Sequence, residues 1–566
     1  MIYLLKEILN NENIDGYIIP KNDEFFSEYS FPNRLKLISN FSGSAGLAII
    51  MKNENLLFVD GRYTLQANIE SGNKFKIYEI PKIMPFEVIK KIKKKITLGF
   101  DPKLFTENNL KTYFKNSCNL MPINKNLIDK ICNLKNNYKI KEFYTLNEKV
   151  TGSSASIKIN NLISILKVRK IDNIFISAPE NCAWILNIRG FDNPNSPIPN
   201  CQIIVNKNKN IYFFSDIKKI KNIKKSINYK KIKFFEFKEF SKIINILKGK
   251  SFCIDRNSCS IFNKSIILSK FKILSGIDPC YQLKAIKNPT EIKNMIDAHI
   301  IDGVALTKFL YWVKKRKNIN LSELYLEKKL ENFRRKNKNF LYPSFNTIAG
   351  SGPNGAIVHY RANKKSNRKL KKKDIFLCDS GGQYKYGTTD VTRTICFSKP
   401  SKKIKDIFTR VLKGHIAVYK TNLNKINTGD EIDKRARFFL KKIKLDYGHG
   451  TGHGVGYFLN VHEGPQAISK FNKVKILPGM ILSNEPGYYK KNKFGIRIEN
   501  LVYVKKDKNN IAFKNLTMAP IDVDLVNFQM LTKEEKKYMR NYHSNVYAKT
   551  SKFLSSNEKK WLSSLL

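Results

Sequence analysis

The chain has 566 residues, and 103 basic against 47 acidic side chains give it a formal net charge of +56 at pH 7. Hydrophobic residues make up 42% of the chain, an ordinary globular composition that excludes wholesale disorder. At roughly 150 residues per domain, the length predicts three to four domains. No apolar run approaches the ~18 residues that a membrane-spanning helix needs, so we expect no membrane partner.

The positive charge comes mostly from scattered lysines. Arginine, whose planar fork reads phosphates and base edges, is much rarer, so we expect no nucleic-acid partner. The nine cysteines show no CxxC spacing, which argues against a disulfide scaffold and against a cysteine-held zinc ion. Glu7 and Glu12 interrupt the first apolar stretch, where a signal peptide would need an apolar core. We therefore expect a cytoplasmic protein.

Hydrophobic patterning divides the chain into three predicted domains. Residues 1–148 and 149–286 each alternate strands with helices, which indicates two α/β units of one kind. Residues 287–566 begin at Asn288, which starts a capping box that ends at Glu291, and they finish in a helical tail over about 505–566. The fold class is therefore α/β (α+β). The predicted strands of the first two domains are 16–20, 47–51, 56–60, 173–177, 202–205 and 211–215.

His299 lies in the helix that follows this capping box. Apolar residues recur at helical spacing on either side of it, and they place His299 on the face that packs against the core. The spacing predicts a hydrogen-bonded core histidine rather than a metal ligand.

Carboxylates occur in pairs on two predicted hairpins of the third domain. Asp379 and Asp390 end and begin neighbouring strands, and a turn centred near residues 384–385 would set them opposite one another. Glu485 and Glu499 form a second facing pair across a turn at residues 490–493, and Arg497 shares a sheet face with Glu499. Like charges that face each other in a sheet are unfavourable, so we expect either a cation between them or protonation of one of the two carboxylates.

Four histidines lie in the same region of the sequence. They are His359, His449, His453 and His462. Gly450, Gly452 and Gly454 interrupt the run around His449 and His453, which disfavours a helix there, and the chain has no HExxH motif. Four carboxylates with one or two imidazoles form a hard, oxygen-rich donor set. Such a set suits two divalent ions such as Mn²⁺, with Co²⁺ or Zn²⁺ as alternatives.

Six segments together resemble the long, three-domain Xaa-Pro aminopeptidases of the pita-bread metallopeptidases, family M24. The resemblance implies two N-terminal creatinase-like domains before a pita-bread catalytic domain. It spans nearly the whole chain, and it is carried by NFSGSAG at 40–46, VDGRY at 59–63, DSGGQY at 379–384, TDVTR at 389–393, GTGHGVG at 450–456 and NVHEGP at 460–465.

The resemblance also implies residue roles. Asp379 would chelate one ion, Asp390 and Glu499 would bridge both ions, and His453 and Glu485 would bind the second. Glu485 would also shuttle a proton from a bridging hydroxide or water. The remaining expected roles belong to His359 and His462 at the substrate carbonyl and leaving group, His449 and Tyr489 in the substrate pocket, and Arg497 as a support for a ligand carboxylate.

The implied activity is removal of the first residue from peptides with proline in second position, by a homodimer joined through its C-terminal domain. Two alternatives remain open at the level of the sequence. One is a prolidase-type dipeptidase or another hydrolase of the same family. The other is a catalytically inactive pita-bread binding module, which is expected to lack the ligands that this chain retains.

Overall fold

The computed structural model describes residues 1–28, 31–92, 94–133, 140–227, 229–316 and 320–566. They form two compact units, Met1–Tyr281 and Gln282–Leu566. The division lies close to the predicted boundary between residues 286 and 287. Within the described residues, none of the helices is long and apolar enough to cross a membrane.

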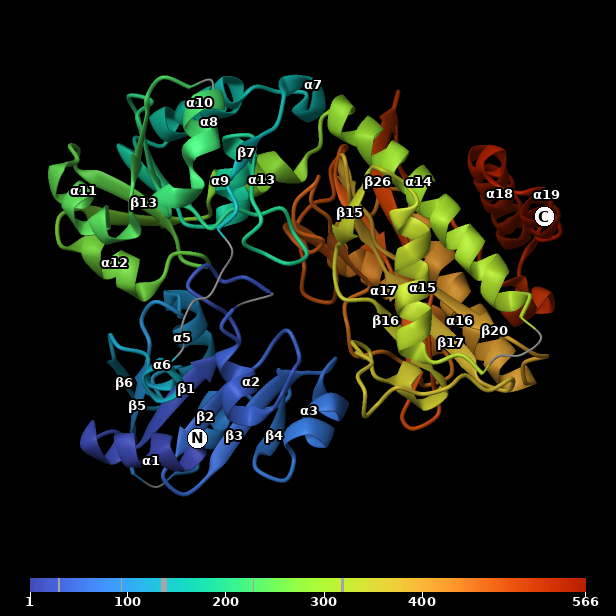
Figure 1. Ribbon diagram of the computed structural model, residues 1–566, viewed down its shortest axis with the longest axis horizontal. Helices are drawn as coiled ribbons and strands as arrows, with labels where there is room; N and C mark the ends of the chain where they lie inside the picture. The colour runs from blue at the N-terminus through green and yellow to red at the C-terminus, as the bar shows by residue number, and fades with distance from the viewer. Residues whose placement is uncertain (29–30, 93, 134–139, 228, 317–319) are drawn as a thin grey trace. The chain divides into compact units, whose positions relative to one another are not determined.

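The first unit contains two six-stranded mixed sheets (Figure 1). The first sheet has the strand order β4-β3-β2-β1-β5-β6. Its central strands β1, β2 and β3 are antiparallel, and the outer pairs are parallel. The strands are β1 (Gly16–Pro20), β2 (Leu47–Met51), β3 (Asn55–Asp60), β4 (Lys76–Ile80), β5 (Thr97–Phe100) and β6 (Asn119–Pro122), and the helices include α1 (Ile2–Asn11), α2 (Arg34–Ser39), α3 (Thr64–Ser71) and α5 (Glu107–Phe114).

The second sheet repeats this topology strand for strand. Its order is β12-β11-β10-β8-β13-β14, with the same antiparallel centre and parallel edges. The prediction of two α/β units of one kind is therefore confirmed. The strands are β8 (Asn173–Ile176), β10 (Gln202–Asn206), β11 (Ile211–Phe214), β12 (Ile232–Phe235), β13 (Ser251–Asp255) and β14 (Lys272–Gly276), with α8 (Ala155–Val168), α9 (Pro179–Ile185), α11 (Phe240–Ile246), α12 (Ile261–Leu268) and α13 (Pro279–Ala285) among the helices.

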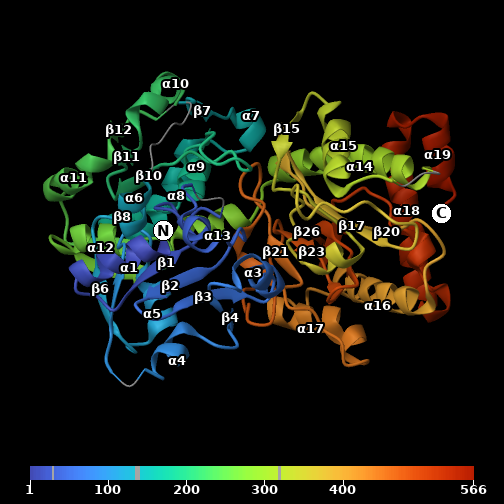
Figure 2. The same cartoon turned by 60° about the horizontal axis from the view of Figure 1, so that its bottom comes forward.

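The second unit places its strands between two pairs of helices, α14 with α15 and α16 with α17 (Figure 2). The predicted capping box at Asn288 and Glu291 opens α14. The helices are α14 (Pro289–Lys314), α15 (Glu323–Arg335), α16 (Lys402–Tyr419) and α17 (Gly429–Lys441). The strands that carry the candidate site are β16 (Ile348–Ser351), β17 (Ile375–Ser380), β20 (Val391–Cys396), β21 (Gly452–Gly454), β22 (Glu463–Ile468), β23 (Ile481–Asn484), β24 (Gly487–Lys490), β25 (Phe494–Arg497), β26 (Asn500–Asp507) and β27 (Asn510–Asn515).

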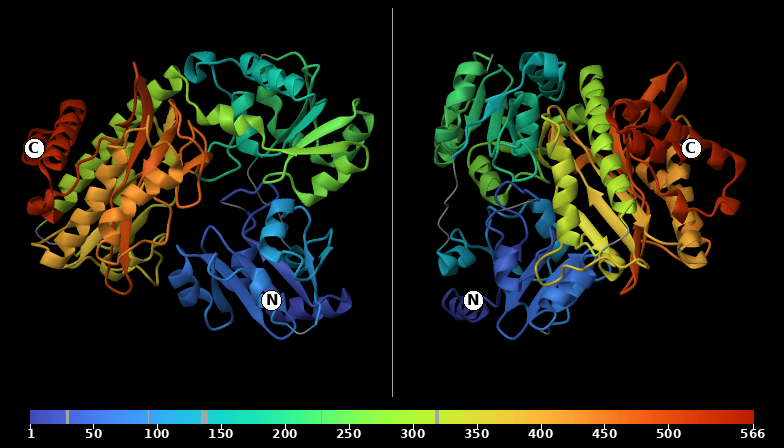
Figure 3. Two further views of the ribbon diagram at one scale, coloured as in Figure 1. Left: turned by 180° about the vertical axis from the view of Figure 1, so that it is seen from behind. Right: turned by 45° about the vertical axis from the view of Figure 1, so that its right-hand side comes forward.

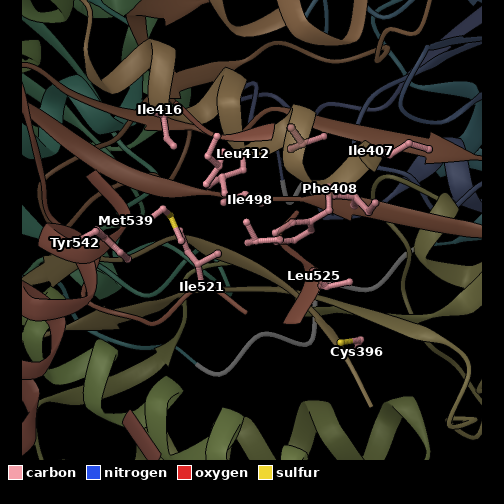
Figure 4. Close-up of a cluster of buried hydrophobic side chains, with 14 of the residues drawn as sticks. Cys396, Ile407, Phe408, Leu412, Ile416, Ile498, Ile521, Leu525, Met539 and Tyr542 are labelled. Carbon is pink, nitrogen blue, oxygen red and sulfur yellow. The ribbon is translucent and has the colours of Figure 1, made fainter. Parts of the chain in front are cut away.

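The predicted helical tail begins later than residue 505, because β26 and β27 continue to Asn515. The helices that follow are α18 (Lys533–Thr550) and α19 (Ser556–Ser563), and they lie beside α14 (Figure 3). Met539 and Tyr542 of α18 belong to one buried apolar cluster with Phe408 and Leu412 of α16 (Figure 4). The C-terminal helices therefore share the core of the second unit.

His299 is buried, with its Nδ1 2.7 Å from the carbonyl of Met295, as expected of a hydrogen-bonded core histidine. His543 of α18 accepts from the Ile521 backbone N–H through Nε2 at 3.1 Å, and its Nδ1 lies 3.0 Å from the carbonyl of Leu565. Burial lowers the pKa of His543 to about 4, and the positive charge of Arg393 adds to this effect. The imidazole of His543 is therefore neutral near pH 7.

Acidification should weaken the attachment of α18. The pKa of an unfolded histidine, about 6.5, exceeds the folded value, so the unfolded state binds more protons and stability falls as the pH drops below about 6.5. With a folded pKa of about 4, His543 should account for about 2 kcal/mol lost between pH 7.5 and pH 5.0.

Urea unfolding at these two pH values tests this expectation. His543→Gln keeps an acceptor for the Ile521 N–H but does not titrate, so its loss of stability should be about 2 kcal/mol smaller. Equal losses in the variant and the unmodified protein would contradict the assignment.

Candidate metal centre

The first carboxylate pair consists of Asp379 on β17 and Asp390 directly before β20. Asp379 pairs with Thr392 in the antiparallel ladder, so the prediction that it faces Asp390 directly was wrong by two residues. The reason is the turn: Tyr384 pairs with Gly387, which centres the hairpin one residue later than expected. A shift of two residues keeps both carboxylates on the same face of the sheet, because side chains alternate.

The second pair follows the predicted register. Asn484 pairs with Asn500 on one side, and Gly487 pairs with Arg497 on the other. Both pairings share one register, which places Glu485 opposite Glu499. The facing arrangement of these two glutamates is confirmed.

His453 comes from the short strand β21, not from a helix, as its glycine neighbours indicated. A Cβ at Gly452 would lie 2.0 Å from the carbonyl oxygen of Ser483, so the close approach of β21 to β23 requires glycine there. His453 Nε2 lies 3.5 Å from Asp390 Oδ2 and 3.5 Å from Glu485 Oε1. One imidazole thus faces a carboxylate from each hairpin.

Asp390, His453 and Glu499 offer ligand atoms that all lie within 4.8 Å of one another. Glu485 joins them through its contact with His453. Asp379 joins them through Arg497, whose guanidinium donates to Asp379 Oδ2 and to Thr392 Oγ1, the hydroxyl that donates to Glu499 Oε2. The structure therefore gathers all five predicted ligands around one location.

The cluster is electrostatically unfavourable without a cation. Burial raises the pKa of Asp379 to about 7, with Arg497 opposing the shift and Asp390 and Glu485 adding to it. Burial, together with neighbouring carboxylates, raises the pKa of Glu499 well above its ordinary value. Asp379 Oδ1 is buried and has no hydrogen-bond partner among the described residues. Buried, mutually repelling carboxylates with a free oxygen fit the needs of divalent cations.

The pKa of His453 is also raised, but by attraction to the carboxylates rather than by burial. Its burial lowers the pKa, but the hydrogen bond to Asp390 and the charges of Glu485 and Asp390 outweigh burial and raise the pKa to about 9. Its Nδ1 lies 2.9 Å from the carbonyl of Gly454, so Nδ1 donates and Nε2 faces the carboxylates. This is the orientation that a metal-binding imidazole requires.

Arg497 supports the cluster from its edge, with 1% of its surface exposed. Its Nη2 donates to Asp379 Oδ2 at 2.6 Å, and its Nε donates to Thr392 Oγ1 at 3.0 Å. Its Nη1 donates to the Tyr489 hydroxyl at 2.6 Å. The contact between Arg497 and a candidate ligand carboxylate agrees with the role expected from the sequence.

Sequence reasoning missed two hydroxyl groups that hold the candidate ligands. Thr392 Oγ1 donates to Glu499 Oε2 at 2.8 Å while it accepts from Arg497. Ser483 Oγ accepts from the His453 backbone N–H at 2.9 Å and donates to Glu485 Oε1 at 3.1 Å. Strand alternation was the available signal, because each hydroxyl lies two residues from a candidate ligand and on the same face.

The other predicted histidines are placed as follows. His449 Nδ1 lies 2.7 Å from the carbonyl of Gly450, so Nε2 accepts from the Tyr489 hydroxyl at 2.9 Å. The ring of His462 lies 4.4 Å from that of His453, centroid to centroid. His359 follows Val358, whose carbonyl accepts from Arg497 Nη1 at 3.4 Å.

Glu463, the residue after His462, anchors this loop. It is fully buried and pairs with Lys284 Nζ at 2.7 Å and with Lys287 Nζ at 2.5 Å. Burial alone would raise the pKa of Glu463, but the two ammonium groups lower it below its ordinary value. The loop that presents His462 is thus fastened to the segment just before α14.

A second acidic group does not need a metal ion. Cys396, Asp522 and Asp524 also bring ligand atoms together. Lys314 Nζ already lies 2.6 Å from Asp522 Oδ1 and 2.8 Å from Asp524 Oδ2. The lysine supplies the positive charge at this location.

Comparison with known families agrees with this site. The model of metallopeptidase family M24 matches residues 293–506, and the model of its C-terminal region matches 509–564. Two models of the creatinase/prolidase N-terminal domain match residues 1–131 and 133–291. The chain belongs to metallopeptidase family M24, which confirms the predicted family, the fold class and the assignment as an enzyme.

Within this family, the similarity extends over the full length. The chain is 36% identical over 582 residues to Xaa-Pro aminopeptidase 1 of Dictyostelium discoideum, covering 96% of this chain and 91% of the relative. It is 34% identical to a probable Xaa-Pro aminopeptidase P of Paracoccidioides brasiliensis, covering 99% and 97%. The crystal structure of X-prolyl aminopeptidase from Caenorhabditis elegans, described as a cytosolic enzyme with a di-nuclear active site, matches with a TM-score of 0.93 at 30% identity, covering 100% and 98%.

Thr392→Val should weaken metal binding without disturbing the fold. Valine keeps the shape of the side chain but removes the hydroxyl that orients Glu499, so we expect divalent-metal affinity about 10-fold lower. Competition with a chelating dye measures this affinity. Thr409→Val is the matched control, because Thr409 is also buried, but its hydroxyl donates to the Lys405 carbonyl and accepts from the Asn527 backbone N–H, and neither is a candidate ligand. A loss of affinity shared by both variants would contradict a role specific to Thr392.

Proposed function

We propose that the chain is a metal-dependent aminopeptidase that removes the N-terminal residue from peptides with proline in second position. The convergence of Asp379, Asp390, His453, Glu485 and Glu499 on one location carries this proposal. The full-length similarity to Xaa-Pro aminopeptidases supports the substrate class.

Each of the five candidate ligands has an expected position in a dinuclear metal centre. Asp379 would hold one ion, His453 with Glu485 would hold the other, and Asp390 with Glu499 would lie between them. When bound, two divalent ions activate a water molecule and polarise the scissile carbonyl. The oxygen-rich donor set favours Mn²⁺ as the native metal, with Co²⁺ or Zn²⁺ as alternatives.

The protein's own side chains handle the proton and the substrate. Glu485 is half-buried, and its Oε1 is oriented by Ser483, so it can take a proton from the attacking water and pass it to the leaving nitrogen. His462, beside His453, and His359 would contact the substrate carbonyl and leaving group, and would stabilise the tetrahedral intermediate. His449 and Tyr489 would line the substrate pocket.

The chemistry of the substrate agrees with this arrangement. A bond to proline is a tertiary amide without an N–H, so a peptidase cannot recognise it through that donor. A site that acts on the carbonyl oxygen avoids this requirement. The buried acidic groups also provide a negative field for the free amino group of the first residue.

Several finer assignments belong to the same proposal. They are a division at residues 1–148, 149–286 and 287–566, a cytoplasmic location, a homodimer joined through the C-terminal domain, and no nucleic-acid partner. The resemblance to Xaa-Pro aminopeptidases supports the dimer and the division. The scarcity of arginine among the basic residues supports the absence of a nucleic-acid partner.

Peptide length separates the proposed activity from that of a prolidase. The purified protein should release the first residue from an Xaa-Pro-Yaa tripeptide, lose this activity to a chelator and recover it with Mn²⁺. Cleavage restricted to Xaa-Pro dipeptides would favour the prolidase alternative. Metal binding without cleavage of either substrate would favour an inactive binding module.

Asp390→Asn should reduce turnover by more than about 10²-fold, because it removes the charge of a bridging ligand. Circular dichroism should show an intact fold, because asparagine keeps the size of the side chain and Asp390 lies just before β20 rather than within it. Asp524→Asn serves as the control in the second acidic group and should keep the unmodified rate. Full activity in Asp390→Asn would exclude the bridging role.

A further inference from the structure

The five candidate ligands come from two separate sheets. Asp379 belongs to the sheet β16-β17-β20, and Asp390 directly precedes β20. His453 lies on the sheet that contains β21, β23 and β26, while Glu485 and Glu499 directly flank β23 and β26. A metal centre can exist here only if the two sheets are held in a fixed position against each other.

Arg393 of β20 joins these two sheets. Its Nη1 donates to the carbonyl of Thr392 at 2.8 Å and to the carbonyl of Glu499 at 2.6 Å. The backbone N–H of Glu499 also donates to the Thr392 carbonyl at 3.2 Å. Arg393 Nη1 thus connects the main chain of Glu499, a candidate bridging ligand, to the main chain of Thr392 in β20.

The other donors of Arg393 end on the C-terminal part of the chain. Nε donates to the carbonyl of Pro520 at 2.9 Å, and the two protons of Nη2 are shared among Ala519 O, Asn500 Oδ1 and the Tyr542 hydroxyl, each 2.8 Å away. Arg393 is 1% exposed, and no carboxylate pairs with it in the described part of the chain. A buried charge without a counter-ion is tolerated only when its N–H groups are satisfied, so each acceptor contributes to its position.

Tyr542 supplies one of these acceptors from α18. Its hydroxyl has a single proton, which it donates to the Ala519 carbonyl at 2.7 Å, leaving a lone pair for Arg393. Figure 4 shows Tyr542 beside Met539 and Ile521 in the buried apolar cluster of the second unit. The tyrosine therefore connects α18 to Arg393 at a fixed position.

We propose that Tyr542 is a positioning residue for the metal centre, which acts through Arg393 on the main chain of Glu499. The proposal rests on the proposed function, because it assigns Glu499 to the metal ions. It makes the C-terminal region a structural part of the catalytic assembly.

Two conservative variants of the full-length protein test this role. Tyr542→Phe removes the hydroxyl that receives Arg393. Tyr538→Phe is the matched control, because Tyr538 is buried one turn earlier on α18 and, among the described residues, its hydroxyl accepts only from Asn515 Nδ2, at 3.4 Å. Each protein is stripped with a chelator, and Mn²⁺ affinity is measured by competition with a chelating dye, alongside the thermal midpoint of the metal-free protein.

We expect Tyr542→Phe to raise the Kd for Mn²⁺ about 3- to 10-fold, and Tyr538→Phe to stay within about 2-fold of the unmodified protein. Activity of Tyr542→Phe should recover as Mn²⁺ is raised. Unchanged affinity in Tyr542→Phe, or an equal loss in both variants, would overturn this inference and leave the proposed function standing. Failure of the unmodified protein to bind any divalent metal would overturn both.

Discussion

Repulsion among buried carboxylates is the constraint on which the second unit depends. Asp379, Asp390, Glu485 and Glu499 share one interior location with a single imidazole, and their charges oppose one another. Folding must therefore supply rigid support, because these side chains would otherwise move apart. Two arginines provide this support. Arg497 donates hydrogen bonds to the side chains of Asp379 and Thr392, and Arg393 donates to the backbone carbonyls of Thr392 and Glu499.

The sequence was informative where local patterning decides the structure. The turn at residues 490–493 set Glu485 opposite Glu499, and the glycines around His453 argued against a helix. Strand runs in the first unit were equally readable, because buried apolar segments end at turn residues. The error in the first hairpin arose from one residue in the turn, and alternation preserved the face of Asp379 and Asp390 despite the shifted register.

Contacts between distant parts of the chain could not be read in this way. Tyr542 lies in a helix with ordinary amphipathic spacing, and its hydrogen bond with Arg393 joins residues 149 positions apart. Lys284 and Lys287 looked like two more members of a lysine-rich population, yet both are buried against Glu463. Because lysine is abundant throughout the sequence, nothing in the composition distinguishes these two buried lysines from the many exposed ones. Only the three-dimensional arrangement distinguishes them.

The pairing of Glu463 with two lysines has a consequence for dividing the chain. Both lysines precede residue 293, where the match to the M24 family model begins, and Asn288 opens α14 after them. A catalytic fragment cut at the start of α14 would leave Glu463 ionised inside the protein with neither ammonium group, at a cost of roughly 3–5 kcal/mol. A fragment starting at Gln282 would retain them. Whether the second unit can fold as a separate fragment therefore depends on a few residues that precede α14.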